Sequence, residues 1–201
     1  MYLLLFICLI IKNINNTEAN FQKIGSECII HNQEFSYEYL YTSDDKDNDQ
    51  TFKRNVYTCP LMNVDDFDKL RWTLVKVNNS ANGTFYLKST KYDEYLCASN
   101  SFADLYGMRR NIMRLQIDMT YTSFHSKCQW KLEKFNSNLN DNTYSIWNLM
   151  YQEPLYAASF LFKETSNKRS IFLWYKPSIN SNKLKWTVDC ISDETRGSAK
   201  I

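Results

Sequence analysis

The chain has 201 residues, of which 44% are hydrophobic and 15% aromatic. This is enough apolar material for a folded core, and it excludes a disordered chain. The 24 basic and 22 acidic residues give a net charge of +2, which argues against bulk nucleic-acid binding because that function usually needs a strongly basic face. Only four glycines and three prolines occur, so collagen-like and linker-rich classes are excluded as well.

The N-terminus begins with an apolar run, Met1–Ile11, that is too short to cross a bilayer as a helix, which takes roughly 20 residues. Its length fits the hydrophobic part of a secretory signal peptide, and Thr17 and Ala19 are small residues suited to a cleavage site after Ala19. No lysine or arginine precedes the run, and a buried strand is the alternative interpretation. We expect residues 1–19 to be a signal peptide and residues 20–201 to form one secreted domain without a membrane span.

Three landmarks recur three times in the same order, about 56 residues apart. They are a leucine two residues after a glutamate, then an arginine, then a tryptophan. The triplets are Leu40, Leu96 and Leu155; Arg54, Arg110 and Arg169; and Trp72, Trp130 and Trp186. The interval from leucine to arginine is identical in every copy. We infer an internal repeat with copies at about 26–78, 79–136 and 137–191, followed by a short tail, 192–201.

Each copy contains four short segments rich in Tyr, Phe, Ile and Leu and separated by Asn, Asp and Ser, as is typical of β-strands. The segments are 28–32, 38–42, 54–59 and 70–77; 84–90, 94–99, 110–117 and the stretch around Trp130; and 144–149, 154–160, 169–175 and 183–188. Three copies of a four-stranded unit predict an all-β fold, the β-trefoil. In that fold the first and fourth strands form a six-stranded barrel, and the second and third form hairpins that cap it. A three-bladed propeller is less favoured, since propellers normally need at least four blades.

The repeated tryptophans, Trp72, Trp130 and Trp186, are predicted to fill the barrel around a pseudo-three-fold axis. The residue two positions earlier is expected on the same strand face, and there Cys128 would stay reduced as a small buried hydrophobe. In the third strands we expect the residues three and five positions after each arginine to face inwards, and those four positions after it to face outwards. The inward set is Tyr57, Cys59, Met113, Leu115, Phe172 and Trp174, and the outward set is Thr58, Arg114 and Leu173.

The chain has six cysteines, and loss of Cys8 with the signal peptide leaves an odd number. Cys28 opens the first strand and Cys190 ends the last. Because a closed trefoil pairs those two strands, we predict a disulfide between them. Cys97 stands where the other copies have tyrosine, and it is our candidate for the unpaired thiol.

The polar stretch 78–84 contains two sequons, which predict glycosylation at Asn78 and Asn82. The acidic segment 44–49 resembles a calcium loop but lacks its glycine and its final glutamate, so we interpret it as a solvated loop. With two histidines and no CxxC motif, no metal or cofactor site is expected. No motif of a known enzyme class, such as GxSxG or HExxH, occurs, and we expect no catalytic activity.

A glutamate and an arginine recur at fixed spacing in every copy, which favours a structural brace across each hairpin. The predicted pairs are Glu38 with Arg54, Glu94 with Arg110, and Glu153 with Arg169. The alternative is an anion site, for instance for a glycosaminoglycan, built from the basic pairs; it makes Arg109 and Arg110 candidate ligand-binding residues. The long loop 118–127 adds Tyr121, Phe124 and His125 as candidates, because apolar residues in a loop can mark a contact surface.

The pattern Glu-Tyr-Leu, then Arg-Arg-x-Ile, then a core tryptophan resembles the β-trefoil repeats of small secreted insect proteins over residues 28–190. The resemblance implies secretion and binding rather than a reaction. The chain differs from ricin-type lectins, whose repeats carry glutamine two residues before the tryptophan, and from Kunitz-type trypsin inhibitors, whose N-terminal signature is missing.

We therefore expect a secreted, monomeric binding protein whose partner is an extracellular protein or glycan. It would present loops on a rigid barrel, because loops on such a scaffold commonly carry binding residues. The alternative is a protease inhibitor that acts through one exposed loop.

Overall fold

The structure is a computed structural model that describes residues 26–46, 53–77, 83–103, 108–116, 126–135, 142–161, 167–175 and 181–191. Several expectations fall outside these ranges and stay predictions. They concern the signal peptide, the C-terminal tail, Asn78, Asn82, Tyr121, Phe124 and His125.

Twelve strands are present in the described part of the chain, four in each repeat. The first repeat contains β1 (Glu27–Asn32), β2 (Glu38–Lys46), β3 (Lys53–Pro60) and β4 (Arg71–Lys76). The second contains β5 (Thr84–Ser89), β6 (Tyr95–Phe102), β7 (Arg109–Leu115) and β8 (Gln129–Lys134). The third contains β9 (Thr143–Asn148), β10 (Glu153–Leu161), β11 (Arg169–Trp174) and β12 (Trp186–Ile191). Each strand overlaps its predicted segment.

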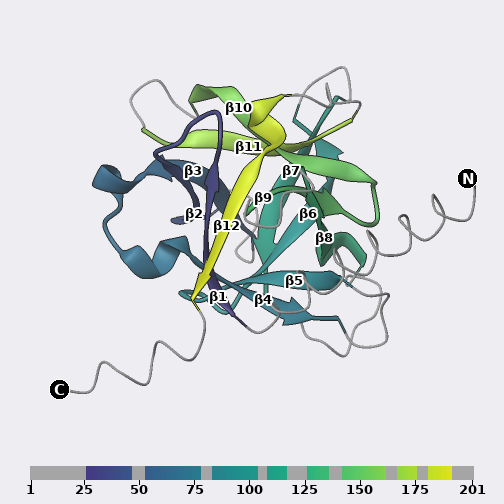
Figure 1. Cartoon of the computed structure of the whole chain (residues 1–201), viewed down its shortest axis with the longest axis horizontal. Helices are drawn as coiled ribbons and strands as arrows, with labels where there is room; N and C mark the ends of the chain where they lie inside the picture. Colours follow the sequence, from purple (N-terminus) through teal and green to yellow (C-terminus); the bar gives the residue numbers. More distant parts are fainter. Residues whose placement is uncertain are drawn as a thin grey trace, which may run out of the picture.

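The first and fourth strands of the repeats form a closed antiparallel ring in the order β1, β4, β5, β8, β9 and β12, with β12 returning to β1. β1 and β12 run side by side in Figure 1. The hairpins β2–β3, β6–β7 and β10–β11 cap one end of this barrel, and their third strands also pair with one another. This arrangement is the predicted β-trefoil, and closure leaves few free sheet edges.

The structure places the three repeated tryptophans inside the barrel, each with 0% of its surface exposed. Each indole Nε1 donates a hydrogen bond to the backbone carbonyl of the repeated leucine in the same copy. The distances are 3.0 Å from Trp72 to Leu40, 2.9 Å from Trp130 to Leu96, and 3.0 Å from Trp186 to Leu155. Two of the sequence landmarks therefore contact each other, and this contact joins the barrel to its cap.

The predicted facing of the third strands is wrong. Thr58, Arg114 and Leu173 are fully buried, whereas Phe172 and Trp174 are only half-buried. The reason is that the residue two positions after each arginine, such as Ile171, points into the barrel core, and strand alternation then buries the residue four positions after it. In the first two repeats the other face is covered by the end of the connection to the fourth strand, Leu70 and Cys128.

Those connections contain short 3-10 turns: η1 (Leu61–Asn63), η2 (Phe67–Leu70), η3 (Ser126–Cys128) and η4 (Asn182–Leu184). The residue two positions before each tryptophan ends a turn instead of lying within a strand, contrary to our expectation. Leu70 and Cys128 pack in small clusters outside the barrel core, and η2, η3 and η4 contact β2, β6 and β10 respectively.

The predicted disulfide between Cys28 and Cys190 is confirmed, and it joins directly paired residues of β1 and β12. The predictions for the other cysteines are wrong. Cys97 is bonded to Cys128, and the free cysteine of the described chain is Cys59, which is buried. Cys128 ends η3, which packs on β6, so its sulfur meets Cys97 outside the barrel.

Candidate functional site

Two of the repeated glutamates, Glu38 and Glu153, pair with an arginine of another repeat and not within a hairpin as predicted. The side chain of Arg54, the predicted partner of Glu38, lies outside the described residues. Arg169 donates two hydrogen bonds to Glu38, each of 2.8 Å. Arg110 donates two to Glu153, of 2.8 and 3.1 Å. The third strands of different repeats pair with one another, and this pairing brings each of these arginines to the glutamate of a neighbouring copy.

The second-repeat glutamate, Glu94, lies 3.2 Å from the fully buried guanidinium of Arg114, a pair that we did not predict. Arg110, with 8% of its surface exposed, lies 3.6 Å from the ring centroid of Tyr151 and 4.4 Å from that of Phe102. These contacts place Arg110 in the brace. Its neighbour Arg109 occupies the opposite face of β7, because adjacent residues of a strand point to opposite sides.

The outer face of each hairpin carries three equivalent positions: the residue after the repeated leucine, the residue five after the repeated arginine, and the residue two before the tryptophan. They are Tyr41, Cys59 and Leu70 in the first repeat, Cys97, Leu115 and Cys128 in the second, and Tyr156, Trp174 and Leu184 in the third. We call these three sets the outer clusters. They differ in how far each is covered.

The outer cluster of the first repeat is buried under the segment that contains η2. Lys69 of this segment is only 4% exposed, and it forms ion pairs with Asp44 and Asp65. Burial would lower the pKa of Lys69, but its hydrogen bonds to Asp44 and Asp65 outweigh this effect and raise it. Burial raises the pKa of Tyr41, whose hydroxyl donates to Asp65, to about 12.

The outer cluster of the second repeat is closed by the disulfide. Cys97 and Cys128 are both fully buried, and Met113 and Leu115 pack beside them. Neither the first nor the second repeat therefore offers an open aromatic surface at this position.

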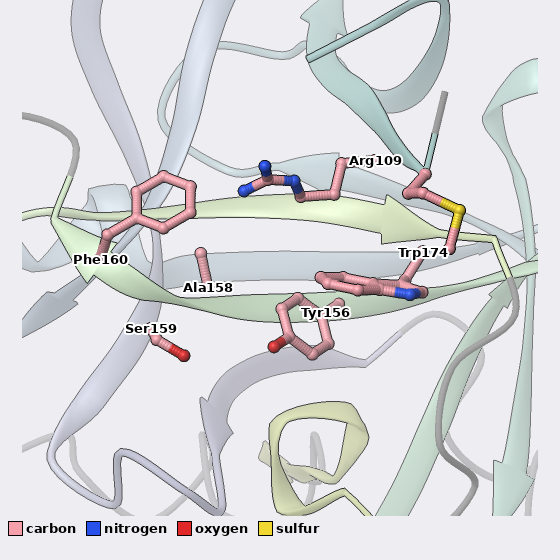
Figure 2. Close-up of a pocket in the computed structure, with 7 residues that line it drawn as sticks. Arg109, Tyr156, Ala158, Ser159, Phe160 and Trp174 are labelled. Atoms are coloured by element: carbon pink, nitrogen blue, oxygen red, sulfur yellow. The ribbon is translucent and has the colours of Figure 1, made fainter. Parts of the chain in front are cut away.

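The third repeat differs, because two members of its outer cluster, Tyr156 and Trp174, line an open pocket of about 390 Å³. The pocket is lined by Met108, Arg109, Tyr156, Ala158, Ser159, Phe160 and Trp174, and we call it the aromatic pocket. Figure 2 shows the small side chain of Ala158 between Phe160 at one end and Tyr156 and Trp174 at the other. The rings of Tyr156 and Trp174 lie 4.4 Å apart, and Phe160 is 47% exposed.

Arg109 reaches the aromatic pocket from β7, where it pairs with Trp174 across the sheet. Its guanidinium carbon lies 5.2 Å from the ring centroid of Phe160 and 5.7 Å from that of Phe172, within cation–π range. In Figure 2 the guanidinium points toward Phe160. Of the two predicted ligand-binding arginines, Arg109 therefore lines the aromatic pocket, and Arg110 is held in the ion pair with Glu153.

Lys183 of η4 lies at the edge of the aromatic pocket. Its Nζ is hydrogen-bonded to the hydroxyl of Ser159 and lies 5.9 Å from the ring centroid of Tyr156. The hydroxyl of Ser181 caps η4 by accepting a hydrogen bond from the backbone of Lys183, which fixes the start of the turn.

A second, smaller pocket of about 200 Å³ lies along the barrel wall. It is lined by Glu133, Lys134, Phe135, Ser145, Trp147, Pro154 and Leu184. The indole of Trp147 donates to the hydroxyl of Ser145 at 2.8 Å, which satisfies its polar atom within the protein.

Sequence reasoning missed Tyr156, Phe160, Trp174 and Lys183 as site residues. A signal was present, because tryptophan stands in the third copy where the other two have Cys59 and Leu115. The expected inward facing of Trp174 would place it in the core and hide it as a site residue. A residue that breaks the three-fold pattern on the outer face of a strand is therefore the sequence feature that indicates this site.

No protein-family model matches the chain, and no curated protein matches it. Among solved structures, a Caenorhabditis elegans protein of unknown function is 14% identical with a TM-score of 0.65, over 82% of this chain and 93% of that chain. The designed three-fold symmetric protein ThreeFoil is 14% identical with a TM-score of 0.59, over 82% and 99%. A Culex quinquefasciatus salivary protein of the cysteine- and tryptophan-rich (CWRC) family is 18% identical with a TM-score of 0.54, over 84% and 95%. At these identities the likeness establishes the β-trefoil fold, and the mosquito protein agrees with the resemblance to insect trefoils.

Two further properties concern the described residues alone. They contain no helix that is both long and apolar enough to cross a membrane. They also contain no group of three or more His, Cys, Asp or Glu side chains placed to hold a metal ion.

Proposed function

We propose that this chain is a secreted, non-enzymatic protein that binds an extracellular glycan in the aromatic pocket of its third repeat. One observation carries the proposal. Of three equivalent outer clusters, two are buried by the protein itself, and the third, with Tyr156 and Trp174, opens into a pocket. A half-exposed aromatic cluster is costly to leave in water unless a ligand covers it.

The chemistry of the pocket suits a sugar. Aromatic faces carry negative partial charge, and they attract the C–H groups on the apolar face of a pyranose ring. The hydroxyl of Ser159 and the guanidinium of Arg109 add donors at the rim, as binding pockets combine apolar walls with a few polar groups. Among the described residues that line the pocket there is no histidine, cysteine or carboxylate, and this lining favours binding over catalysis.

Secretion is supported by the two disulfides, because such bonds persist in oxidising compartments and are rare in the cytosol. The buried bond between Cys97 and Cys128 also closes the outer cluster of the second repeat.

A glycan array of neutral and acidic sugars, followed by calorimetry on the best ligand, tests the proposal. Trp174→Ala should weaken binding by about tenfold or more, since aromatic anchors dominate small binding sites. The matched control is Trp147→Ala, which removes an indole from the second pocket and should leave the affinity unchanged. Equal affinity of Trp174→Ala and the unsubstituted protein would contradict the proposal, as would a glycan array without any ligand.

A further inference from the structure

A lysine precedes the buried residue at the end of each 3-10 turn in all three repeats: Lys69, Lys127 and Lys183. The first and third of these lysines occupy matching positions. The Nζ of Lys69 lies 5.8 Å from the ring centroid of Tyr41, and that of Lys183 lies 5.9 Å from the equivalent ring of Tyr156. The first repeat is therefore an internal reference for the surroundings of Lys183.

In the first repeat two carboxylates surround the ammonium. Lys69 pairs with Asp65 at 2.7 Å and with Asp44, so its charge is neutralised within the protein. A buried cation needs such partners, because removing it from water without compensation is costly.

In the third repeat neither carboxylate has a counterpart. Ser159 occupies the position of Asp44, and in the sequence Ile179 stands four residues before the lysine, where the first repeat has Asp65. Within the described part of the chain, Lys183 contacts the hydroxyl of Ser159 and the ring of Tyr156 but no carboxylate. The acidic groups that complete the first repeat are thus replaced by neutral ones at the aromatic pocket.

We infer that the ligand supplies the missing acid: a carboxylate or sulfate group of an acidic glycan binds Lys183, which contacts the lining residues Ser159 and Tyr156, and Arg109 in the lining of the pocket is a second cation. This inference rests on the proposed function and names its ligand class. Charge complementarity between two cations and an acidic sugar fits a site whose remaining walls are aromatic.

The decisive variant rebuilds the first-repeat pair in the third repeat. Ser159→Asp places a carboxylate beside Lys183, as Asp44 lies beside Lys69, and it should lower the affinity for acidic oligosaccharides by about tenfold or more. Ser159→Asn is the matched neutral comparison, since Asn100 stands at this position in the second repeat. Any affinity that it loses measures the loss of the Ser159 hydroxyl, and Ser159→Asp should lose at least tenfold more. Lys183→Met should lose affinity, and Lys183→Arg should keep most of it. Thermal unfolding checks that every variant is folded.

Three probes of equal length identify the acid: a heparin oligosaccharide, a hyaluronan oligosaccharide with carboxylates only, and a neutral chitin oligosaccharide. Loss of heparin or hyaluronan binding in Ser159→Asp, with chitin binding weak and unchanged, supports the inference. Tight binding of hyaluronan that is lost in the variant shows that a carboxylate suffices, and tight binding of heparin alone points to sulfate. Neutral chitin binding as tightly as the acidic probes, or Ser159→Asp binding acidic probes normally, overturns it while glycan binding stands. If none of the probes and no array glycan binds, the proposed function itself fails.

Discussion

The guanidinium of Arg169 in the third repeat binds the carboxylate of Glu38 in the first through two parallel hydrogen bonds of 2.8 Å. The hydroxyl of Thr58 donates to the same carboxylate, and the ring centroid of Phe35 lies 3.6 Å from the guanidinium. Bidentate pairs of this kind combine charge with fixed geometry. The pair connects residues far apart in the chain, and it holds one hairpin of the cap to another.

Removal of one member of this pair should destabilise the fold. We expect Glu38→Ala to lower the free energy of unfolding by about 3 kcal/mol, because it leaves a largely buried arginine without its acid. The double variant with Arg169→Met should recover part of that loss. Urea unfolding of the two single variants and the double variant measures the coupling, and a single-variant loss below about 1 kcal/mol would make the pair no more than a surface salt bridge.

The core tryptophans should contribute equally to the free energy of unfolding, since each fills the equivalent position of its repeat and donates to the equivalent leucine carbonyl. Trp72→Phe, Trp130→Phe and Trp186→Phe should each cost about 2–4 kcal/mol through a lost hydrogen bond and a small cavity. Chemical denaturation of the three variants checks this expectation. A cost confined to one of them would show that the three-fold symmetry does not extend to the energetics.

The two disulfides should contribute unequally to the free energy of unfolding. In the chain-entropy model, a bond that closes a loop of 162 residues stabilises by about 5 kcal/mol, and one that closes 31 residues by about 4 kcal/mol. Cys28→Ser with Cys190→Ser should therefore be the more destabilising pair, and Cys97→Ser with Cys128→Ser the milder one. The reverse order in unfolding measurements would mean that packing around Cys97 and Cys128 matters more than loop closure.

The free thiol of Cys59 should make stability fall in alkaline solution. Burial raises its pKa from 9.0 to about 11, with Lys168 opposing and Glu38 and Asp65 adding to the effect. The unfolded chain loses this proton first, so the stabilising contribution is complete below pH 9 and is lost as the pH rises towards about 11.

Urea unfolding between pH 7 and 11 of the unsubstituted protein and of Cys59→Ala tests this. Burial also raises the pKa of Tyr41 and Tyr92, each to about 12, but both proteins share those tyrosines, so the difference isolates Cys59. A difference that does not change with pH would contradict the prediction. Iodoacetamide should label Cys59 only after unfolding.

The features that follow from the three-fold repeat could be predicted from the sequence: the twelve strands and the tryptophans inside the barrel. The closing disulfide could be predicted as well, because the first and last strands of a trefoil pair with each other. The facing of the third strands could not be predicted, because their buried face contains the polar Thr58 and Arg114, whereas their other face contains apolar residues. In β11, Leu173 faces the barrel and Trp174 faces the aromatic pocket, and composition does not distinguish them.

The candidate site was predicted only in part. Arg109 was identified as one of a basic pair, and strand alternation places it on the opposite face of β7 from Arg110. The aromatic rings that Arg109 meets depend on which strands of different repeats lie side by side. The partner of Glu38 also depends on contacts between repeats, since Arg169 reaches Glu38 through the pairing of β11 with β3. Contacts between repeats are not encoded in the spacing within a repeat.

The three outer clusters also show how one architecture accommodates change. The second repeat has a disulfide in its outer cluster, the first has a network of ion pairs around Lys69, and the third has the proposed ligand surface. The barrel beneath all three keeps the same hydrogen bond from indole to carbonyl. Mutations at Tyr156, Phe160 or Ser159 therefore act on a surface that is separate from the barrel core. Selection can alter what such a protein recognises without endangering its ability to fold.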